Sequence, residues 1–439
     1  MMTARLFAAR WGASRVAKVS QVVVANGFNN LASLAITLHA ARKLGPERFG
    51  QLGLVLAVIS FGVVLLDSGV SVALVRGYNH DPKAESREAL VGGVLKAKLL
   101  QLLLVALLAV PIAHAVRFFI PEFNSLETLA AGIVAAGLMS LWVTVRSLEQ
   151  ARQNYARFTT YIYLYGTLRF CAYVVVLMRG SISPLSVISC LYLVPLLLLM
   201  LYSFAFRETQ VLAIGKFPWA REVNALKKAL HYGAWIAGAS ILLSFLTRMP
   251  VFFLAKRSTP RELGLFAAAF TFVNAFGLIW DALSTVIMPE VSGLHTAESR
   301  VRFQKLLFRK LPLMGSLLAA VIVACAFAQY FMLGPQFRAS LWSFIVLGSF
   351  VAACMCISVN NNLVHAYGIP EVATFMNVAR VAVAALALGL WWHLDALNVA
   401  VIYGFVLLAG DTALLIYVQR RMVKDRISLK LVALYGTES

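Results

Sequence analysis

Long apolar segments recur along the chain and alternate with short polar connections. Each segment is about 20 residues or longer, the length that a helix needs to cross a hydrocarbon layer of about 30 Å. Lipid offers no hydrogen-bond partner to an open strand edge, so we expect the segments to be helices. We place about twelve spans, at 20–40, 49–75, 93–116, 127–147, 158–178, 184–205, 232–255, 263–289, 313–333, 339–362, 371–392 and 397–418. The pattern predicts an all-α polytopic membrane protein, and no connection is long enough for a soluble catalytic domain.

The composition agrees with this pattern, because 61% of the residues are hydrophobic and 13% are charged. The formal net charge of +20 raises the alternative of a nucleic-acid partner. The 39 Lys and Arg residues are sorted by side, however: 27 lie in alternate connections, nine in the others and three inside spans. The positive-inside rule then places both termini in the cytoplasm. We attribute the charge to orientation and to attraction for anionic lipid headgroups, and we expect no nucleic-acid partner.

Motifs for enzyme chemistry do not occur in the sequence. It has no nucleotide-binding loop and no HExxH, CxxC or GxSxG motif. The five cysteines fall within predicted spans without the spacing of a metal or redox site. We therefore expect no catalytic residues, no metal, no cofactor and no enzymatic activity. Transport without ATP hydrolysis is the natural inference, driven by an ion gradient, the membrane potential or the gradient of the substrate.

An internal repeat relates the two halves of the chain. The segment LHAARKLGPERFG matches FFLAKRSTPRELG later in the sequence, which aligns Pro46 with Pro260 and Gly50 with Gly264. The same register aligns two acidic residues inside spans, and the tetrapeptide AESR at 84–87 recurs at 297–300. A repeat of this length predicts two structurally similar bundles.

Each half contains about six spans, an even number, so the halves share one orientation and are related by an axis along the membrane normal. We therefore predict two six-helix bundles. The expected organisation is a basic interfacial segment at 1–19, an N-terminal lobe at 20–206, a cytoplasmic amphipathic linker at 207–231, a C-terminal lobe at 232–419 and a basic cytoplasmic tail at 420–439.

Polar residues form stripes on four of the predicted helices, two from each half. Polar groups inside spans usually face the bundle interior or a water-filled cavity, because facing lipid is costly. The stripes predict a polar seam or an ion-coupling site that includes Asn26, Asn30, Asp67, Ser240, Ser244, Asn274 and Asp281. Two interpretations of the acids remain open. They contact substrate or an ion, or they only tie helix ends together, with Ser68-Gly69 forming a local break.

Two arginines lie near the middle of spans that are equivalent under the repeat, Arg169 in the fifth and Arg380 in the eleventh. An arginine at the bilayer centre costs about 2.5–3.5 kcal/mol on insertion scales, and its planar fork suits phosphate. We interpret both as cations that line a substrate cavity. The alternative is internal pairing with an acid such as Glu149 or Asp411.

A third arginine, Arg248, lies two residues before Pro250 in the seventh span. Proline removes a backbone donor and bends a helix, so Pro250 is a candidate hinge. Arg248 is then a further cavity cation near a gate, or it extends to the outer membrane surface. Lys96 and Lys98, near the cytoplasmic mouth of the third span, are interpreted as topology anchors.

Two further polar segments have less specific interpretations. The linker sequence KFPWAREVNALKKALHYG is amphipathic, so we expect a helix at the level of the lipid headgroups, with docking to a partner enzyme as the alternative. The triplet Asn360-Asn361-Asn362 is interpreted as the polar end of the tenth span.

The stretch ARKLGPERFGQLGLVLAVISFGVVLLDSGVSVALVR resembles the opening of Wzx-type O-antigen and polysaccharide flippases, which belong to the multidrug/oligosaccharidyl-lipid/polysaccharide exporter superfamily. LGPERFG and LDSGV carry most of this resemblance. It implies two helical bundles that alternate between cytoplasm-open and periplasm-open states in a bacterial inner membrane. It also implies the substrate, an O-antigen, capsule or exopolysaccharide repeat unit on undecaprenyl diphosphate. Polymerase and chain-length proteins of a polysaccharide pathway are the partners it suggests. Members of the family commonly line the central cavity with cations, and by that analogy Arg169, Arg248 and Arg380 are candidates; the family has no fixed motif at these positions, so their assignment rests on burial and chemistry.

Three alternatives remain. An ion-coupled exporter of small molecules with the same fold would use an acidic cavity for cationic compounds. A flippase for the peptidoglycan precursor usually carries two further spans and an Arg-Asp cluster in the first span, where this chain has Asn29-Asn30. A membrane glycan polymerase or ligase normally presents a large periplasmic loop, and no connection here is that long.

Overall fold

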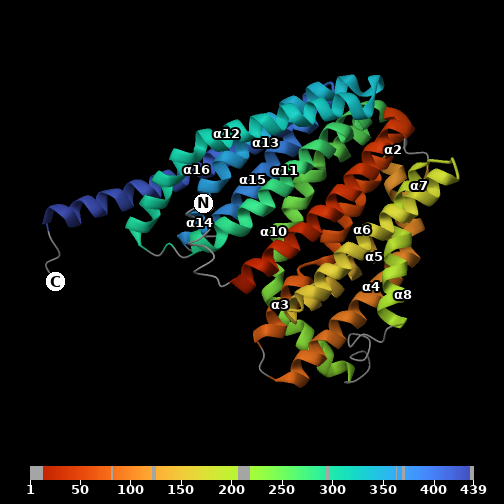
Figure 1. The fold of residues 1–439 in the computed structure, drawn as a ribbon, viewed down its shortest axis with the longest axis horizontal. Coiled ribbons are helices and arrows are strands. Elements are labelled where there is room, and N and C mark those ends of the chain that lie inside the picture. Colours follow the sequence, from red (N-terminus) through yellow and green to blue (C-terminus); the bar gives the residue numbers. More distant parts are fainter. Residues whose placement is uncertain are drawn as a thin grey trace. The chain divides into compact units, whose positions relative to one another are not determined.

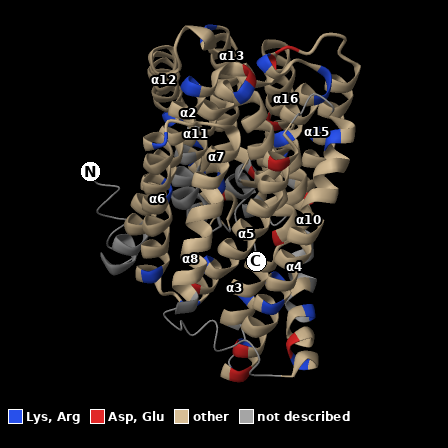
Figure 2. Cartoon of the chain, turned by 90° about the vertical axis from the view of Figure 1, so that its right-hand side faces the viewer, with Lys and Arg blue, Asp and Glu red and all other residues tan. Residues whose placement is uncertain are grey.

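The computed structural model describes residues 13–80, 83–120, 125–205, 218–292, 294, 296–361, 363–367 and 371–435. Within these residues the regular structure is helical and no strand is found (Figure 1). Nine helices of the described part are long and apolar enough to cross a membrane. The predicted all-α polytopic membrane fold is confirmed. Most of the ribbon carries neither acidic nor basic residues (Figure 2).

Contacts divide the chain into two compact units. The first comprises Met1–Leu44 and Gln51–Ser244, and the second comprises Gly45–Gly50 and Phe245–Ser439. Helix α10 (Trp219–Arg257) contributes to both units.

The helices of the first unit correspond to the first six predicted spans. They are α2 (Ala13–Asp67), α3 (Val70–His80), α4 (Ala84–Phe119), α5 (Leu126–Ala151), α6 (Tyr155–Met178), α7 (Pro184–Ile188), the π-helix η1 (Ser189–Leu193) and α8 (Val194–Ala205). The helices of the second unit, beyond its part of α10, are α11 (Pro260–Ser292), α12 (Ala297–Leu333), the 3₁₀ turn η2 (Pro335–Phe337), α13 (Arg338–Asn361), α14 (Leu363–Ala366), α15 (Glu371–Leu390) and α16 (Ala396–Tyr435).

The internal repeat is visible in where helices begin. Both copies of AESR start a helix, α4 at Ala84 and α12 at Ala297. The two aligned prolines also lie at helix starts: Pro260 begins α11, and Pro46 follows a kink in α2 where Gly45 has φ 73°. Proline suits the first helical turn because its missing N–H is not needed there.

The aligned glycines of the repeat pack directly against each other inside the second unit. A Cβ built on Gly50 would lie 2.1 Å from the carbonyl oxygen of Pro260, and one built on Gly264 would lie 1.8 Å from that of Pro46. Each glycine therefore faces the proline carbonyl of the other segment. Only a residue without a Cβ permits so close an approach of two backbones.

The start of α10 belongs to the first unit and packs on α4. Glu222 is fully buried, and its carboxylate accepts a hydrogen bond of 2.6 Å from the Lys96 ammonium on α4. Gly93 lies one turn before Lys96, and a Cβ built on it would be 2.8 Å from the carbonyl oxygen of Glu222. Leu226 packs on the hydrophobic core formed by α4, α5 and α8. The described part of the amphipathic linker is thus the first turns of a long helix packed on α4.

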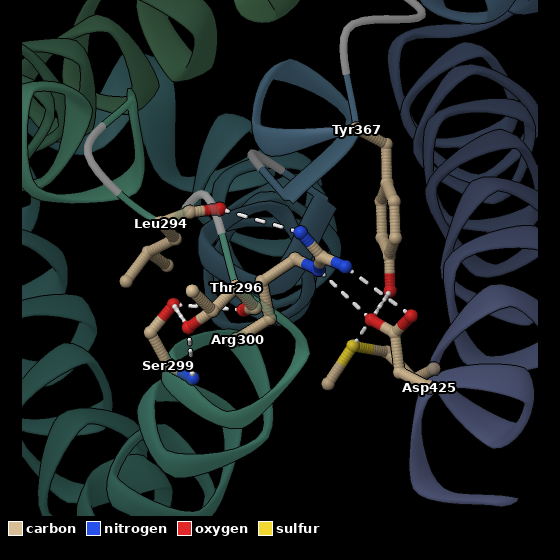
Figure 3. Close-up of polar contacts among 7 residues, drawn as sticks. Leu294, Thr296, Ser299, Arg300, Tyr367 and Asp425 are labelled. Atoms are coloured by element: carbon tan, nitrogen blue, oxygen red, sulfur yellow. Dashed lines mark hydrogen bonds and ion pairs between the residues drawn. The ribbon is translucent and has the colours of Figure 1, made fainter. Parts of the chain in front are cut away.

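A polar cluster holds one end of the second unit together (Figure 3). The Arg300 guanidinium on α12 donates two hydrogen bonds to Asp425 on α16, from Nε at 2.8 Å and from Nη2 at 3.2 Å. The Tyr367 hydroxyl, just after α14, donates to the same carboxylate at 2.9 Å. Burial, together with the hydrogen bond to Asp425, raises the pKa of Tyr367 to about 12. The cluster covers an apolar core that includes Leu363 and Val418.

Candidate functional site

The second predicted span is broken at the acid. Helix α2 ends at Asp67, Ser68 and Gly69 take positive φ angles of 44° and 73°, and α3 begins at Val70. The predicted break at Ser68-Gly69 is confirmed. The break leaves the Leu66 carbonyl outside the helical ladder, and a buried carbonyl needs another donor.

Side chains of neighbouring helices supply the donors. The Lys98 ammonium donates to the Leu66 carbonyl at 2.6 Å, and the Gln101 amide donates to the same oxygen at 3.0 Å. Lys98 also donates to the Ser140 hydroxyl at 2.9 Å and is only 3% exposed. The interpretation of Lys98 as a topology anchor is therefore wrong, because its charge is buried and caps the break.

Asp67 contributes to the same cluster. Its Oδ1 accepts a hydrogen bond of 2.5 Å from Ser71 and lies 3.9 Å from the Lys98 ammonium. The carboxylate thus compensates the charge of the buried lysine and ties the end of α2 to the start of α3. These contacts give Asp67 a structural role at the break.

Arg169 lies on α6 inside the first unit and is 5% exposed. Its Nε donates to the Leu191 carbonyl at 2.7 Å, and its Nη1 donates to the Asn29 amide oxygen at 3.4 Å. Its Nη2 donates to the Tyr165 hydroxyl, and the guanidinium carbon lies 3.8 Å from the centre of the Tyr165 ring. The arginine is therefore held by neutral groups.

The acceptor for Arg169 comes from an irregular helical turn. Ser189–Leu193 is a π-helix, and Pro195, four residues after Leu191, has no N–H to donate to the Leu191 carbonyl, so this oxygen accepts instead from both Arg169 and Tyr165. The acid considered as a partner, Glu149, accepts instead from Arg152 at 3.3 Å. Within the described residues, no carboxylate forms an ion pair with Arg169.

Arg380, on α15 of the second unit, has the opposite environment. Its Nη2 donates to Asp411 Oδ1 at 2.6 Å, and its Nη1 donates to the Asn377 amide oxygen at 3.3 Å. The Asp411 carboxylate also accepts hydrogen bonds from Ser358 at 3.2 Å and from Asn361 at 3.4 Å. The alternative of pairing with an acid therefore describes Arg380, whereas Arg169 has only neutral partners.

The asparagine triplet belongs to this network. Asn360 and Asn361 are 2% and 6% exposed, so these two residues are not a solvated helix end. Gln304 on α12 donates to Asn360 at 3.1 Å, while Asn361 donates to the backbone carbonyl of Asp411 at 3.0 Å. The two neighbours on α13 thus link α12 to α16. Asn362 lies outside the described residues.

Arg248 lies in the same unit, on α10. Its guanidinium carbon is 5.5 Å from the centre of the Phe270 ring. Two of the three predicted cations, Arg248 and Arg380, thus belong to the second unit. Pro250 is buried within α10, which continues as a helix through it.

The other predicted seam residues differ in exposure. Asn26, Asn30 and Ser244 are half-buried, whereas Ser240 and Asn274 are exposed. The side chain of Asp281 lies outside the described residues.

Several residues of the two networks were not predicted from the sequence. Asn29 contacts Arg169, although the stripe on this helix was defined by Asn26 and Asn30. Asn29 lies about 100° around the helix from Asn30, so a strict periodic stripe leaves it out. The sequence did contain one signal that Lys98 is buried. Lys98 lies inside an apolar segment two residues after Lys96, so the two lysines are on different faces of the helix.

Comparison with known proteins places this geometry in context. The family described as polysaccharide biosynthesis protein matches residues 40–337, more than half of the chain. The fold resembles an inward-facing multidrug resistance MATE family transporter of the MOP superfamily, with a TM-score of 0.70 and 13% identity over 91% of this chain and 95% of that one. It also resembles the lipid II flippase MurJ in an inward closed conformation, with a TM-score of 0.67 and 13% identity over 95% of this chain and 93% of that one. No curated protein matches the sequence significantly. The predicted fold is confirmed, and the family model agrees with the predicted resemblance to polysaccharide biosynthesis proteins.

Proposed function

The chain belongs to the polysaccharide biosynthesis protein family, and we propose that it is a flippase for an undecaprenyl-diphosphate-linked oligosaccharide. It moves this lipid across the bacterial inner membrane by alternating access, with both termini in the cytoplasm. The family, the multi-pass helical structure and a fold like that of a lipid II flippase support the proposal.

The observation that carries the proposal is the environment of Arg169. A buried charge without a counter-ion is unfavourable, and an anionic ligand would supply the missing charge. The guanidinium fork matches two phosphate oxygens at once, and such charge-assisted bonds are stronger than those Arg169 makes to neutral oxygens. In the second unit, the Arg380 guanidinium is paired with Asp411, and Arg248 lies over the ring of Phe270. The first unit therefore carries the argument for an anionic substrate.

A second candidate is an ion-coupled exporter of small molecules, because the fold also resembles that of a multidrug transporter. Such a protein needs acidic groups that can receive a cation. Asp67 is engaged by Ser71 and lies near Lys98, and Asp411 is engaged by Arg380. The arrangement of these two acids favours the flippase.

The test is mass spectrometry of lipid-linked glycans in a strain that lacks this gene. Complete undecaprenyl-linked repeat units should accumulate while surface polysaccharide disappears, and the wild-type gene should restore both. Arg169→Gln should fail to restore them, because glutamine keeps hydrogen bonding without the charge. Arg179→Gln, which changes an exposed arginine just beyond the same helix, is the matched control and should restore them fully.

Two outcomes would contradict the proposal. An unchanged pool of lipid-linked glycans and normal surface glycan in the deletion strain would favour the ion-coupled exporter of small molecules instead. Full restoration by Arg169→Gln, at a membrane level equal to wild type, would remove this arginine from the substrate site.

A further inference from the structure

The guanidinium of Arg169 is held along one of its edges. Its Nε donates to the Leu191 carbonyl at 2.7 Å, and its Nη2 donates to the Tyr165 hydroxyl. The Tyr165 ring also packs on the guanidinium, with its centre 3.8 Å from the guanidinium carbon. The protein itself therefore occupies the edge formed by Nε and Nη2.

The two terminal nitrogens of Arg169 keep donors for a further partner. Nη1 donates to the Asn29 amide oxygen on α2 at 3.4 Å, a long hydrogen bond. A guanidinium has five N–H groups, and the three hydrogen bonds of Arg169 use three of them. Among the residues that the structure describes, one N–H on each terminal nitrogen has no acceptor. Two such N–H groups form the fork that suits two oxygens of one phosphate group.

The contact with Arg169 also fixes the orientation of the Asn29 amide. A guanidinium offers no acceptor, so the amide must present its oxygen to the arginine and its nitrogen to another side. In the described part of the chain this nitrogen makes no hydrogen bond, and Asn29 is half-buried. Asn29 therefore adds N–H donors next to the fork of Arg169.

Close packing of α2 on α6 keeps Asn29 in this place. A Cβ built on Gly166 would lie 3.3 Å from the Asn29 Cα and 2.9 Å from Cε1 of Phe28. Gly166 is three residues before Arg169, so the two helices approach each other about one turn from the guanidinium. The rings of Phe28 and Tyr163, with centres 5.6 Å apart, pack at the same crossing. The distance between Asn29 and Arg169 is therefore set by two helix backbones.

A ligand for these donors must bring acceptors and negative charge. The unused groups of Arg169 and Asn29 are N–H donors, and the arginine has only neutral partners among the described residues. A sugar hydroxyl would accept a hydrogen bond but would leave the buried charge uncompensated. The oxygens of a phosphoryl group accept several hydrogen bonds at once and supply the charge.

We propose that Asn29 is a specificity-determining residue that binds, together with Arg169, one phosphoryl group of the lipid diphosphate. The guanidinium fork holds two oxygens of this group, and the Asn29 amide nitrogen donates to an oxygen of the same group. The inference rests on the proposed function, since it takes the diphosphate of the substrate as the ligand. It adds a neutral residue on α2 whose amide cannot be replaced by a carboxylate of the same size.

The experiment measures binding of undecaprenyl diphosphate to the purified, detergent-solubilised protein by titration calorimetry, with thermal unfolding of the same samples. Asn29→Asp places a carboxylate beside Arg169, which supplies the missing counter-ion and repels the phosphoryl group. This variant should bind at least about a hundredfold more weakly, while its unfolding temperature equals or exceeds that of wild type. Asn29→Ala removes only the amide donors and should bind about tenfold more weakly. The exposed Asn79→Asp on α3 is the matched control and should behave as wild type.

A second variant leaves both binding groups in place and changes their separation. The added Cβ of Gly166→Ala pushes Phe28 and the α2 backbone at Asn29 away from α6, so binding should weaken. Gly27→Ala, also on α2, is the matched control, because no atom lies within 4 Å of its added Cβ. Equal affinities of these two variants would contradict the close placement that the site requires.

The outcomes separate this inference from the proposed function. Wild-type affinity in both Asn29 variants overturns the role of Asn29 and leaves the proposed function standing. Lost binding in Asn29→Asp together with a lower unfolding temperature makes Asn29 a structural residue and overturns its role as well. Absence of binding by wild type overturns both ideas. Phosphatidylglycerol is the comparison lipid, and equally tight binding of it would show a general anionic headgroup as the ligand and overturn the diphosphate assignment.

Discussion

Replacing Gly264 by alanine tests the glycine with the least space for a Cβ among the described glycines. The added Cβ would lie 1.8 Å from the Pro46 carbonyl oxygen, whereas ordinary contacts begin at 3.4 Å, so the two segments must separate by about 1.6 Å. The Pro46 carbonyl is a backbone group, so it cannot move away from the added Cβ as the end of a flexible side chain could. Overpacking of this kind costs about 1–3 kcal/mol, and the contacts between the Cα–H groups and the carbonyls, worth about 0.5–1 kcal/mol each, are lost as well.

The better helix propensity of alanine offsets part of this loss, by about 0.5–1 kcal/mol. We therefore expect Gly264→Ala to lower the free energy of unfolding by about 1–3 kcal/mol, measured by denaturant unfolding in detergent. Gly50→Ala should cost a similar amount. The double variant should cost less than the sum, because the segments need to separate only once.

Gly315→Ala in α12 is the matched control, because no atom lies within 4 Å of the added Cβ. This change should be neutral or slightly stabilising. The reasoning is refuted if Gly264→Ala unfolds at the same denaturant concentration as Gly315→Ala, or if the two glycine variants are fully additive.

Three further predictions follow from other contacts. Lys96→Met leaves the fully buried Glu222 unpaired and should lower the free energy of unfolding, measured with denaturant, by about 3 kcal/mol. Adding Glu222→Gln to this variant should recover most of the loss, and no recovery would contradict a buried pair. The pKa of Tyr367 is raised from an ordinary 10.0 to about 12, so the folded state holds this proton more tightly than the unfolded state does. The free energy of unfolding should therefore fall as the pH rises from 10.0 toward 12, and Tyr367→Phe should remove this fall. Thermal unfolding against pH for both proteins measures this, and identical profiles would count against it. A reporter fused after Ser439 should be active only in the cytoplasm, and periplasmic activity would reverse the predicted orientation.

Much of the fold could be predicted from the sequence because lipid imposes a simple rule on length and hydrophobicity. The predicted spans lie on helices, the second of them interrupted at Ser68-Gly69, and both copies of AESR, which the repeat aligns, begin a helix. The break at Ser68-Gly69 was also predictable, since glycine tolerates a positive φ and serine can bond its local backbone. These features depend on short stretches of chain.

The polar networks could be predicted only in part, because they depend on which helices are neighbours. Arg169 and Arg380 looked equivalent in the sequence, yet a backbone carbonyl contacts one and a carboxylate contacts the other. Pro195 marks the Leu191 carbonyl as lacking its helical donor, but nothing local shows that Arg169 reaches it. Likewise, Asn360 and Asn361 at a helix end suggest solvent until α12 and α16 are packed on either side of them.

The π-helix at Ser189–Leu193 also determines which face of α8 is apolar core. A π-helical turn contains one residue more than an α-helical turn, so it acts like a single inserted residue. Deleting one residue here would remove the extra residue of the turn and rotate everything after it by about 100°. Leu196 and Leu199, now buried, would turn out of the core, and the exposed Leu197 and Leu198 would turn toward other surroundings. The length of this segment is therefore under tighter constraint than its composition, and a one-residue deletion should be far more damaging than most substitutions within it.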